Sequence, residues 1–140
     1  MKQAGFAFAI IALAMLEIGL AASASAEGDA AKGERVYRKC KACHAIVPGE
    51  SKKTGPNLFG IVGMQAGTGD YNYSDSLVAA GEAGLIWTEE TLDAYIEDAK
   101  SFLSELLDVR KSRVRDKMNF RLRNDGQRED VIAYLESLSE

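Results

Sequence analysis

Five consecutive residues, Cys40-Lys41-Ala42-Cys43-His44, constrain this chain more than any other part of its sequence. They contain both of its cysteines and its only histidine. Two thiols three positions apart lie close together on one helical turn, where each can add to one vinyl group of a porphyrin. The imidazole that follows then lies under the ring, within reach of the iron. The run therefore predicts a covalently attached c-type haem.

The residues alone leave three other interpretations of this run. A thioredoxin-like redox pair needs a preceding strand in a βαβ setting, and none is evident here. A zinc site needs a further suitable ligand nearby, and a chain with one histidine also lacks the second one that the usual zinc enzymes use. The third alternative is a chance pair of core cysteines beside a core histidine. The haem interpretation is preferred to all three.

The first 26 residues predict a targeting segment rather than part of the fold. Lys2 precedes a wholly apolar run from Phe6 to Leu16, and small residues follow farther on. This is the pattern of a secretory signal peptide, with cleavage expected after Ala26 and, as the alternative, after Ala24. An uncleaved membrane anchor is the competing hypothesis, but the apolar run is shorter than the ~20 residues that a spanning helix needs. We therefore expect a cleaved segment at 1–26 and one exported domain at 27–140.

Helical spacing dominates the remaining chain, and no segment alternates convincingly as a strand. Glycine and proline make the stretch from Ile46 to Tyr73 loop-like. The expected helices are one capped by Asp29, a short one over Ser74–Ala80, one capped by Thr88, a short one over Ser101–Leu107, and one over about Gln127–Ser137 capped by Asn124 or Asp125. We therefore predict an all-α fold. Its helices are short and a domain of this size has a limited core, so a large apolar cofactor is expected at the centre.

The iron of such a haem needs a sixth ligand or an open position. After the first 26 residues only two methionines remain, Met64 and Met118. Met64 lies twenty positions after His44 in a glycine-rich loop, which is an awkward position for reaching the opposite haem face. Met118 lies far along the chain and is predicted as the sixth ligand. A His/Met pair raises the reduction potential and leaves no site for oxygen, which indicates electron transfer rather than catalysis.

Taken together, these features resemble the class I c-type cytochromes, specifically the bacterial cytochrome c2 type. The resemblance covers nearly the whole chain after residue 26. The matching segments, in the family's order and rough spacing, are Gly33 with Tyr37, Cys40–His44, Thr54-Gly55-Pro56-Asn57-Leu58, Tyr71-Asn72-Tyr73, Trp87-Thr88-Glu89-Glu90-Thr91-Leu92, Lys117-Met118-Asn119-Phe120 and Ala133-Tyr134-Leu135. The resemblance implies the small cytochrome c fold, in which short helices wrap around one covalently bound haem.

The resemblance also implies roles for single residues. The Pro56 carbonyl is expected to accept the second imidazole N–H of His44, which fixes the ring. Tyr73 and Trp87 look like hydrogen-bond donors to a buried haem propionate, and Tyr95 like the hydroxyl beside the Met118 sulfur. Gly33 and Tyr37 are expected to cross the last helix near Val131 and Tyr134. The resulting cofactor-binding set is Cys40, Cys43, Pro56, Tyr73, Trp87 and Tyr95, with His44 and Met118 on the iron.

Three positions depart from the family pattern. Met64 stands where an arginine usually lies near the propionates, which removes one charge partner. Ala99 stands where a proline often follows the third helix, and the segment from there to Met118 is longer than in the shorter members. Asp116 replaces the hydroxyl residue that usually precedes Lys-Met. A carboxylate there is expected to weaken the loop that holds Met118.

The net charge of −4 conceals a strong asymmetry along the chain. Residues 110–123 carry seven basic side chains and one acid, whereas residues 70–108 carry ten acids and one lysine. Overall acidity is against a nucleic-acid partner. The basic stretch, together with lysines near the same haem edge, predicts a docking ring for acidic redox partners; a merely solvated face is the alternative. The lysines are Lys39, Lys41, Lys52 and Lys53.

We therefore predict a monomeric, soluble, periplasmic one-electron carrier with one haem c and no enzymatic activity. The family implies a cytochrome bc1 complex as donor, and a terminal oxidase, a photosynthetic reaction centre or a reductase as acceptor. No stable membrane insertion is expected after cleavage of the signal peptide. The competing hypothesis is a haem protein with an open sixth position that binds a small ligand or peroxide. The ligation of the iron distinguishes the two.

Overall fold

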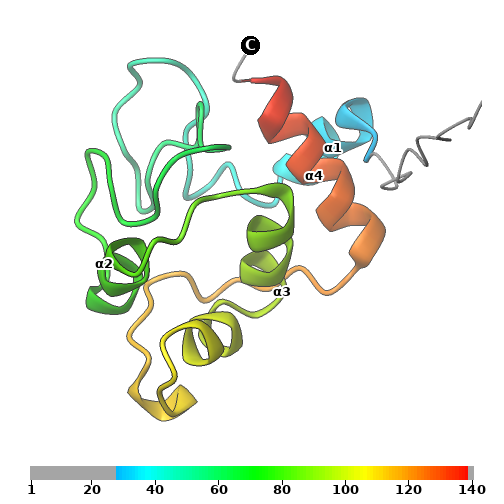
Figure 1. Cartoon of the computed structure of the whole chain (residues 1–140). Helices are drawn as coiled ribbons and strands as arrows, with labels where there is room; N and C mark the ends of the chain where they lie inside the picture. The colour runs from blue at the N-terminus through cyan, green and yellow to red at the C-terminus, as the bar shows by residue number, and fades with distance from the viewer. Residues whose placement is uncertain (1–27, 139–140) are drawn as a thin grey trace, which may run out of the picture.

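The computed structural model describes residues 28–138, and the regular structure in this range is helical (Figure 1). The elements are α1 (Ala30–Tyr37), α2 (Asp75–Glu82), α3 (Glu89–Leu106), the 3-10 helix η1 (Lys111–Arg113) and α4 (Asp125–Ser137). Over residues 28–138 the β-type pairing is limited to an isolated bridge between Gln65 and Ile86. The predicted all-α class is confirmed. The signal peptide predicted for residues 1–26 lies outside the described range.

No helix within residues 28–138 has both the length and the apolar character needed to cross a membrane.

Polar caps fix where the helices begin. The side chains of Asp29 and Thr88 accept hydrogen bonds from the backbone amides of their own first turns, as the sequence indicated. Asn124, rather than Asp125, caps α4, which therefore begins two residues earlier than expected. Ser74 caps α2, which continues to Glu82 instead of ending at Ala80.

A break at Asp98 divides α3 into two helical parts. Its backbone leaves the helical region, with φ −155° and ψ 90°, and its carboxylate accepts the amide of Ser101 at 3.1 Å. Asp98 therefore acts as the N-cap of the second part, and the separate short helix expected over Ser101–Leu107 is present in this form. The change of direction occurs beside Ala99 without the proline that the family often has there.

The packing of α1 on α4 brings the two ends of the domain together (Figure 1). A Cβ at Gly33 would lie 1.9 Å from the backbone oxygen of Asp130, so only glycine permits this approach. The rings of Tyr37 and Tyr134 are 5.9 Å apart, and Val131 is buried. The crossing that the family resemblance implied is confirmed.

Candidate haem site

A cavity of about 400 Å³ lies between the chain that follows α1, the first part of α3 and the irregular segment that precedes α4. Mostly apolar side chains line it. All eight site residues predicted from the sequence contribute to its wall: Cys40, Cys43, His44, Pro56, Tyr73, Trp87, Tyr95 and Met118. The fold thus brings residues from five separate segments to one hollow.

The Cys40–His44 run forms one tight turn directly after α1. The amides of Cys43 and His44 both donate to the carbonyl of Cys40, each at 3.0 Å. Both thiols are free; Cys43 is exposed and Cys40 is half-buried. Burial raises the pKa of the Cys40 thiol. The turn holds two thiols and one imidazole at the same edge of the cavity.

Three neighbours hold His44 in one orientation. Its Nδ1–H donates to the Pro56 carbonyl at 2.8 Å, as the family resemblance implied. The Tyr37 hydroxyl donates to the His44 carbonyl at 2.6 Å. Gly55 lies against the ring, where a Cβ would be 2.5 Å from Cε1. Burial lowers the pKa of His44, which favours the neutral ring and leaves the lone pair on Nε2.

Met118 lies on another wall of the cavity, in a segment without regular secondary structure. Its side chain is partly buried against the core. Contacts on both sides hold the segment: the Arg115 amide donates to Ser76 Oγ at 2.9 Å, Lys117 Nζ donates to the Asn72 carbonyl, and the Leu122 amide donates to the Ile96 carbonyl at 3.0 Å. Met64, the other methionine, is 37% exposed and does not line the cavity.

The hydroxyl of Tyr95 has a partner that sequence analysis missed. It donates to the Asp116 carboxylate, with distances of 3.1 Å to Oδ1 and 3.2 Å to Oδ2. Burial raises the pKa of Asp116 and raises that of Tyr95 well above its ordinary value. The two residues are 21 positions apart, so no local pattern could have paired them. Asp116, expected to weaken the Met118 loop, instead ties it to α3.

Trp87 and Tyr73, the predicted propionate donors, both line the cavity. Trp87 is 5% exposed, and its ring meets that of Tyr95 edge to face at 4.9 Å. Tyr73 is half-buried and packs edge to face on Tyr71 at 5.1 Å. These contacts fix the two rings at the cavity.

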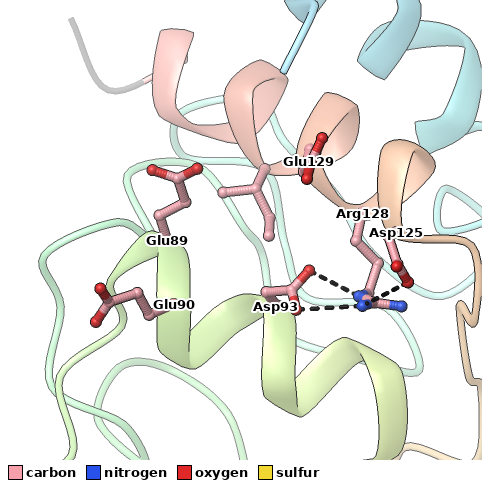
Figure 2. A pocket seen from close by; sticks show the side chains of 7 residues that line it. Glu89, Glu90, Asp93, Asp125, Arg128 and Glu129 are labelled. Carbon is pink, nitrogen blue, oxygen red and sulfur yellow. Dashed lines mark hydrogen bonds and ion pairs between the residues drawn. The ribbon is translucent and has the colours of Figure 1, made fainter. Parts of the chain in front are cut away.

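A second cavity of about 530 Å³ lies between the start of α3 and α4 (Figure 2). Its wall is mainly acidic around Arg128, which is only 5% exposed. Arg128 donates to Asp93 at 2.7 Å and 3.3 Å, to Asp125 at 3.1 Å and to the Leu122 carbonyl at 2.9 Å. Its guanidinium thus joins α3, α4 and the chain that follows Met118.

Arg128 was also missed from the sequence, although its position carried a signal. It lies three, four and seven positions before buried residues of α4, so it belongs to the inward stripe of that helix. The apolar members of that stripe are Val131, Ile132 and Leu135.

The first cavity fits a haem. Apolar walls suit a flat porphyrin, and two thiols on one turn at its edge suit covalent attachment. A neutral imidazole and a thioether are known iron ligands in such sites. The zinc alternative gains nothing here, since residues 28–138 hold no group of three or more His, Cys, Asp or Glu side chains that could bind a metal ion.

Comparison with known proteins agrees with this site. The family described as Cytochrome c matches residues 30–139. Cytochrome c2 of Rhodobacter capsulatus is 48% identical over 126 residues, which is 85% of this chain and 88% of that protein. Cytochrome c-551 of Roseobacter denitrificans is 46% identical over 125 residues, 85% of this chain and 87% of that protein. The solved structure of cytochrome c2 from Rhodospirillum centenum has a TM-score of 0.76 and 43% identity, covering 81% of this chain and 100% of that one.

The cavity, its thiol–imidazole turn and these matches define a class I c-type cytochrome. The chain belongs to the cytochrome c family, and its similarity to the cytochromes c2 extends over most of its length. It is a cytochrome c2-like electron carrier with a covalent haem c, and not an enzyme.

Proposed function

We propose that this protein is a monomeric periplasmic one-electron carrier in which His44 and Met118 are the axial ligands of a haem attached through Cys40 and Cys43. The supporting observation is that one apolar cavity has the thiol–imidazole turn on one wall and Met118 on another, while Met64 does not reach it. The haem, when bound, supplies an iron that accepts and releases a single electron.

In this proposal the residues of the chain keep the iron's surroundings constant. His44 binds through Nε2, because its Nδ1 hydrogen is committed to the Pro56 carbonyl. Gly55 and Tyr37 hold the ring and backbone of His44, so the imidazole does not need to move when the electron does. Tyr73 and Trp87 are proposed as donors to a haem propionate.

Export is the second part of the proposal. The family match begins at residue 30, and the apolar N-terminal pattern precedes it. We expect cleavage after Ala26, or after Ala24, to leave a domain that begins at Glu27 or Ser25. N-terminal sequencing of the native protein should begin near Glu27. A native chain that begins at Met1 would contradict export with cleavage.

The proposed partners present acidic docking faces: a cytochrome bc1 complex as donor and a terminal oxidase or photosynthetic reaction centre as acceptor. Lys39 and Lys117 line the cavity, and Lys41 is exposed beside Cys43. A positive rim of this kind steers association with a negative partner and loses its effect as salt is added. The rate of electron transfer to such a partner should fall with ionic strength. A rate that does not change with salt would contradict this part.

The decisive experiment concerns the iron. Holoprotein purified after maturation should be low-spin, with a sulfur-to-iron charge-transfer band in the red. Met118→Ala should abolish the band, and the matched change Met64→Leu should keep it. A wild-type protein that is high-spin and binds carbon monoxide readily would instead support the hypothesis of an open sixth position.

A further inference from the structure

Packing holds the Tyr95 ring in place independently of the hydrogen bond that its hydroxyl makes. The residue is 8% exposed on α3, and its ring meets Trp87 edge to face at 4.9 Å and Phe102 at 6.3 Å. Aromatic rings in such contacts have little freedom to turn. The hydroxyl therefore occupies a fixed position at the cavity wall.

Asp116 brings the chain before Met118 to that fixed hydroxyl. The Tyr95 hydroxyl oxygen lies 3.1 Å from Oδ1 of Asp116 and 3.2 Å from Oδ2. The segment has no helix or strand of its own, and its backbone bonds to the rest of the fold lie at Arg115 and Leu122, on either side of Met118. Asp116 is thus the point near Met118 at which a buried side chain of α3 holds the segment.

We propose that the hydrogen bond from Tyr95 to Asp116 is the contact that keeps Met118 closed over the haem, and that both are positioning residues for the sulfur. This inference rests on the proposed ligation by Met118. A phenol has a single hydrogen to donate, and in this structure the carboxylate receives it. Tyr95 therefore acts on the sulfur through the segment rather than by donating to it.

The proposal predicts how easily another ligand displaces the sulfur. Imidazole reaches the ferric iron only from the population in which Met118 has dissociated, so its apparent affinity reports that population. Asp116→Ala and Tyr95→Phe each remove one end of a charge-assisted bond. Each should lower the apparent dissociation constant for imidazole by roughly tenfold or more.

Two further variants separate positioning from general destabilisation. The double variant Asp116→Ala with Tyr95→Phe should bind imidazole no more tightly than Asp116→Ala alone, because without Asp116 the Tyr95 hydroxyl no longer holds the segment. Asp116→Asn keeps an acceptor oxygen for Tyr95 and should recover most of the wild-type affinity. Tyr134→Phe, at the α1–α4 crossing, is the matched control and should leave the affinity unchanged.

The experiment is an imidazole titration of each ferric holoprotein. Binding is monitored through the loss of the sulfur-to-iron band. Single variants whose imidazole affinity stays within about twofold of wild type, or effects that add in the double variant, would overturn the proposal. If Asp116→Ala does not mature, Tyr95→Phe and Asp116→Asn still test it. A wild-type protein without the band would instead overturn ligation by Met118, and so the proposed function itself.

Discussion

The two walls of the haem cavity are built in different ways. On the His44 wall, the partners are close in the sequence: Tyr37 is 7 positions away and Pro56 is 12. On the Met118 wall, the partners are distant: Tyr95 is 21 positions from Asp116, and Ser76 is 39 from Arg115. Local contacts order few residues, whereas distant ones must close long loops first.

This difference predicts different behaviour under stress. The Met118 segment is held by partners that are distant in sequence, whereas the His44 wall also has short-range backbone bonds at the Cys40–His44 turn, so the segment should open at a lower free energy than the His44 wall. In a denaturant titration, the sulfur-to-iron band should disappear at a lower denaturant concentration than the signals that report the haem environment as a whole. The first three changes below test that difference and the fourth tests the kink in α3, from the largest expected effect to the smallest.

Replacing Arg128 with methionine should widen the difference between the walls. It removes the guanidinium that joins Asp93 on α3 to the carbonyl of Leu122, which follows Met118 in the chain. Asp93 and Asp125 remain in contact with solvent, so the cost comes from the charge-assisted bonds that are lost and from the Leu122 carbonyl left without its donor, and we expect a loss of about 3 kcal/mol in the free energy of unfolding. The sulfur-to-iron band should vanish at much lower denaturant. The control is Arg123→Met, at an exposed position just before α4. The free energy of unfolding of this variant should stay within about 0.5 kcal/mol of wild type.

Adding a methyl group at Gly55 should instead damage the His44 wall. In Gly55→Ala the new Cβ lies 2.5 Å from Cε1 of His44, so the ring or the loop must shift. We expect a loss of about 2 kcal/mol, with the band and global structure lost together. Gly126→Ala in α4 meets only ordinary contact and should be neutral or slightly stabilising. Early loss of the band alone in Gly55→Ala would contradict the assignment of Gly55 to the His44 wall.

Removing the Tyr37 hydroxyl tests one local hydrogen bond of the His44 wall by itself. Tyr37→Phe loses the 2.6 Å bond to the His44 carbonyl and should cost about 1 kcal/mol. Burial raises the pKa of Tyr37 to about 12, so the hydroxyl remains a donor throughout the neutral range and the effect should not depend on pH there. Chemical denaturation at pH 6 and pH 9 measures it. A cost that changes between these two values would be inconsistent with a protonated donor.

The smallest expected effect concerns Asp98 at the α3 kink. The hydrogen bond from Lys111 is the main cause that lowers the pKa of Asp98 to about 2, and the Ser101 amide and Arg121 act in the same direction. A lowered carboxyl pKa gives stability that is complete above about pH 4, the ordinary value, and is lost as pH falls toward 2. Thermal unfolding of Asp98→Asn should therefore show a shallower decline over this window. A decline as steep as that of wild type would show that Asp98 does not contribute.

The features that could be predicted from the sequence are those with local causes. The helix caps Asp29 and Thr88 act on amides three residues away, and the Cys40–His44 turn carries its own chemistry. Gly33 was placed correctly at the crossing with α4 because the resemblance supplied the partner that spacing could not.

The features that could not be predicted depend on distant partners or on charge in unexpected places. The burial of Arg128 depends on Asp93, which lies 35 positions earlier. The basic stretch was predicted as a docking ring, and two of its exposed members, Lys111 and Arg121, also contact Asp98, at 2.8 Å and 3.4 Å. Composition gives the number of charges but not which of them are already paired within the chain.

The crossing of α1 and α4 through Gly33 has a consequence for the order of events during biosynthesis. The two helices lie at opposite ends of the domain's sequence, so their crossing cannot form until nearly the whole domain is present. Until α4 arrives, Tyr37 lacks the neighbour against which its ring packs. The last helix therefore has to dock before the thiol-bearing turn, which directly follows α1, acquires its final support.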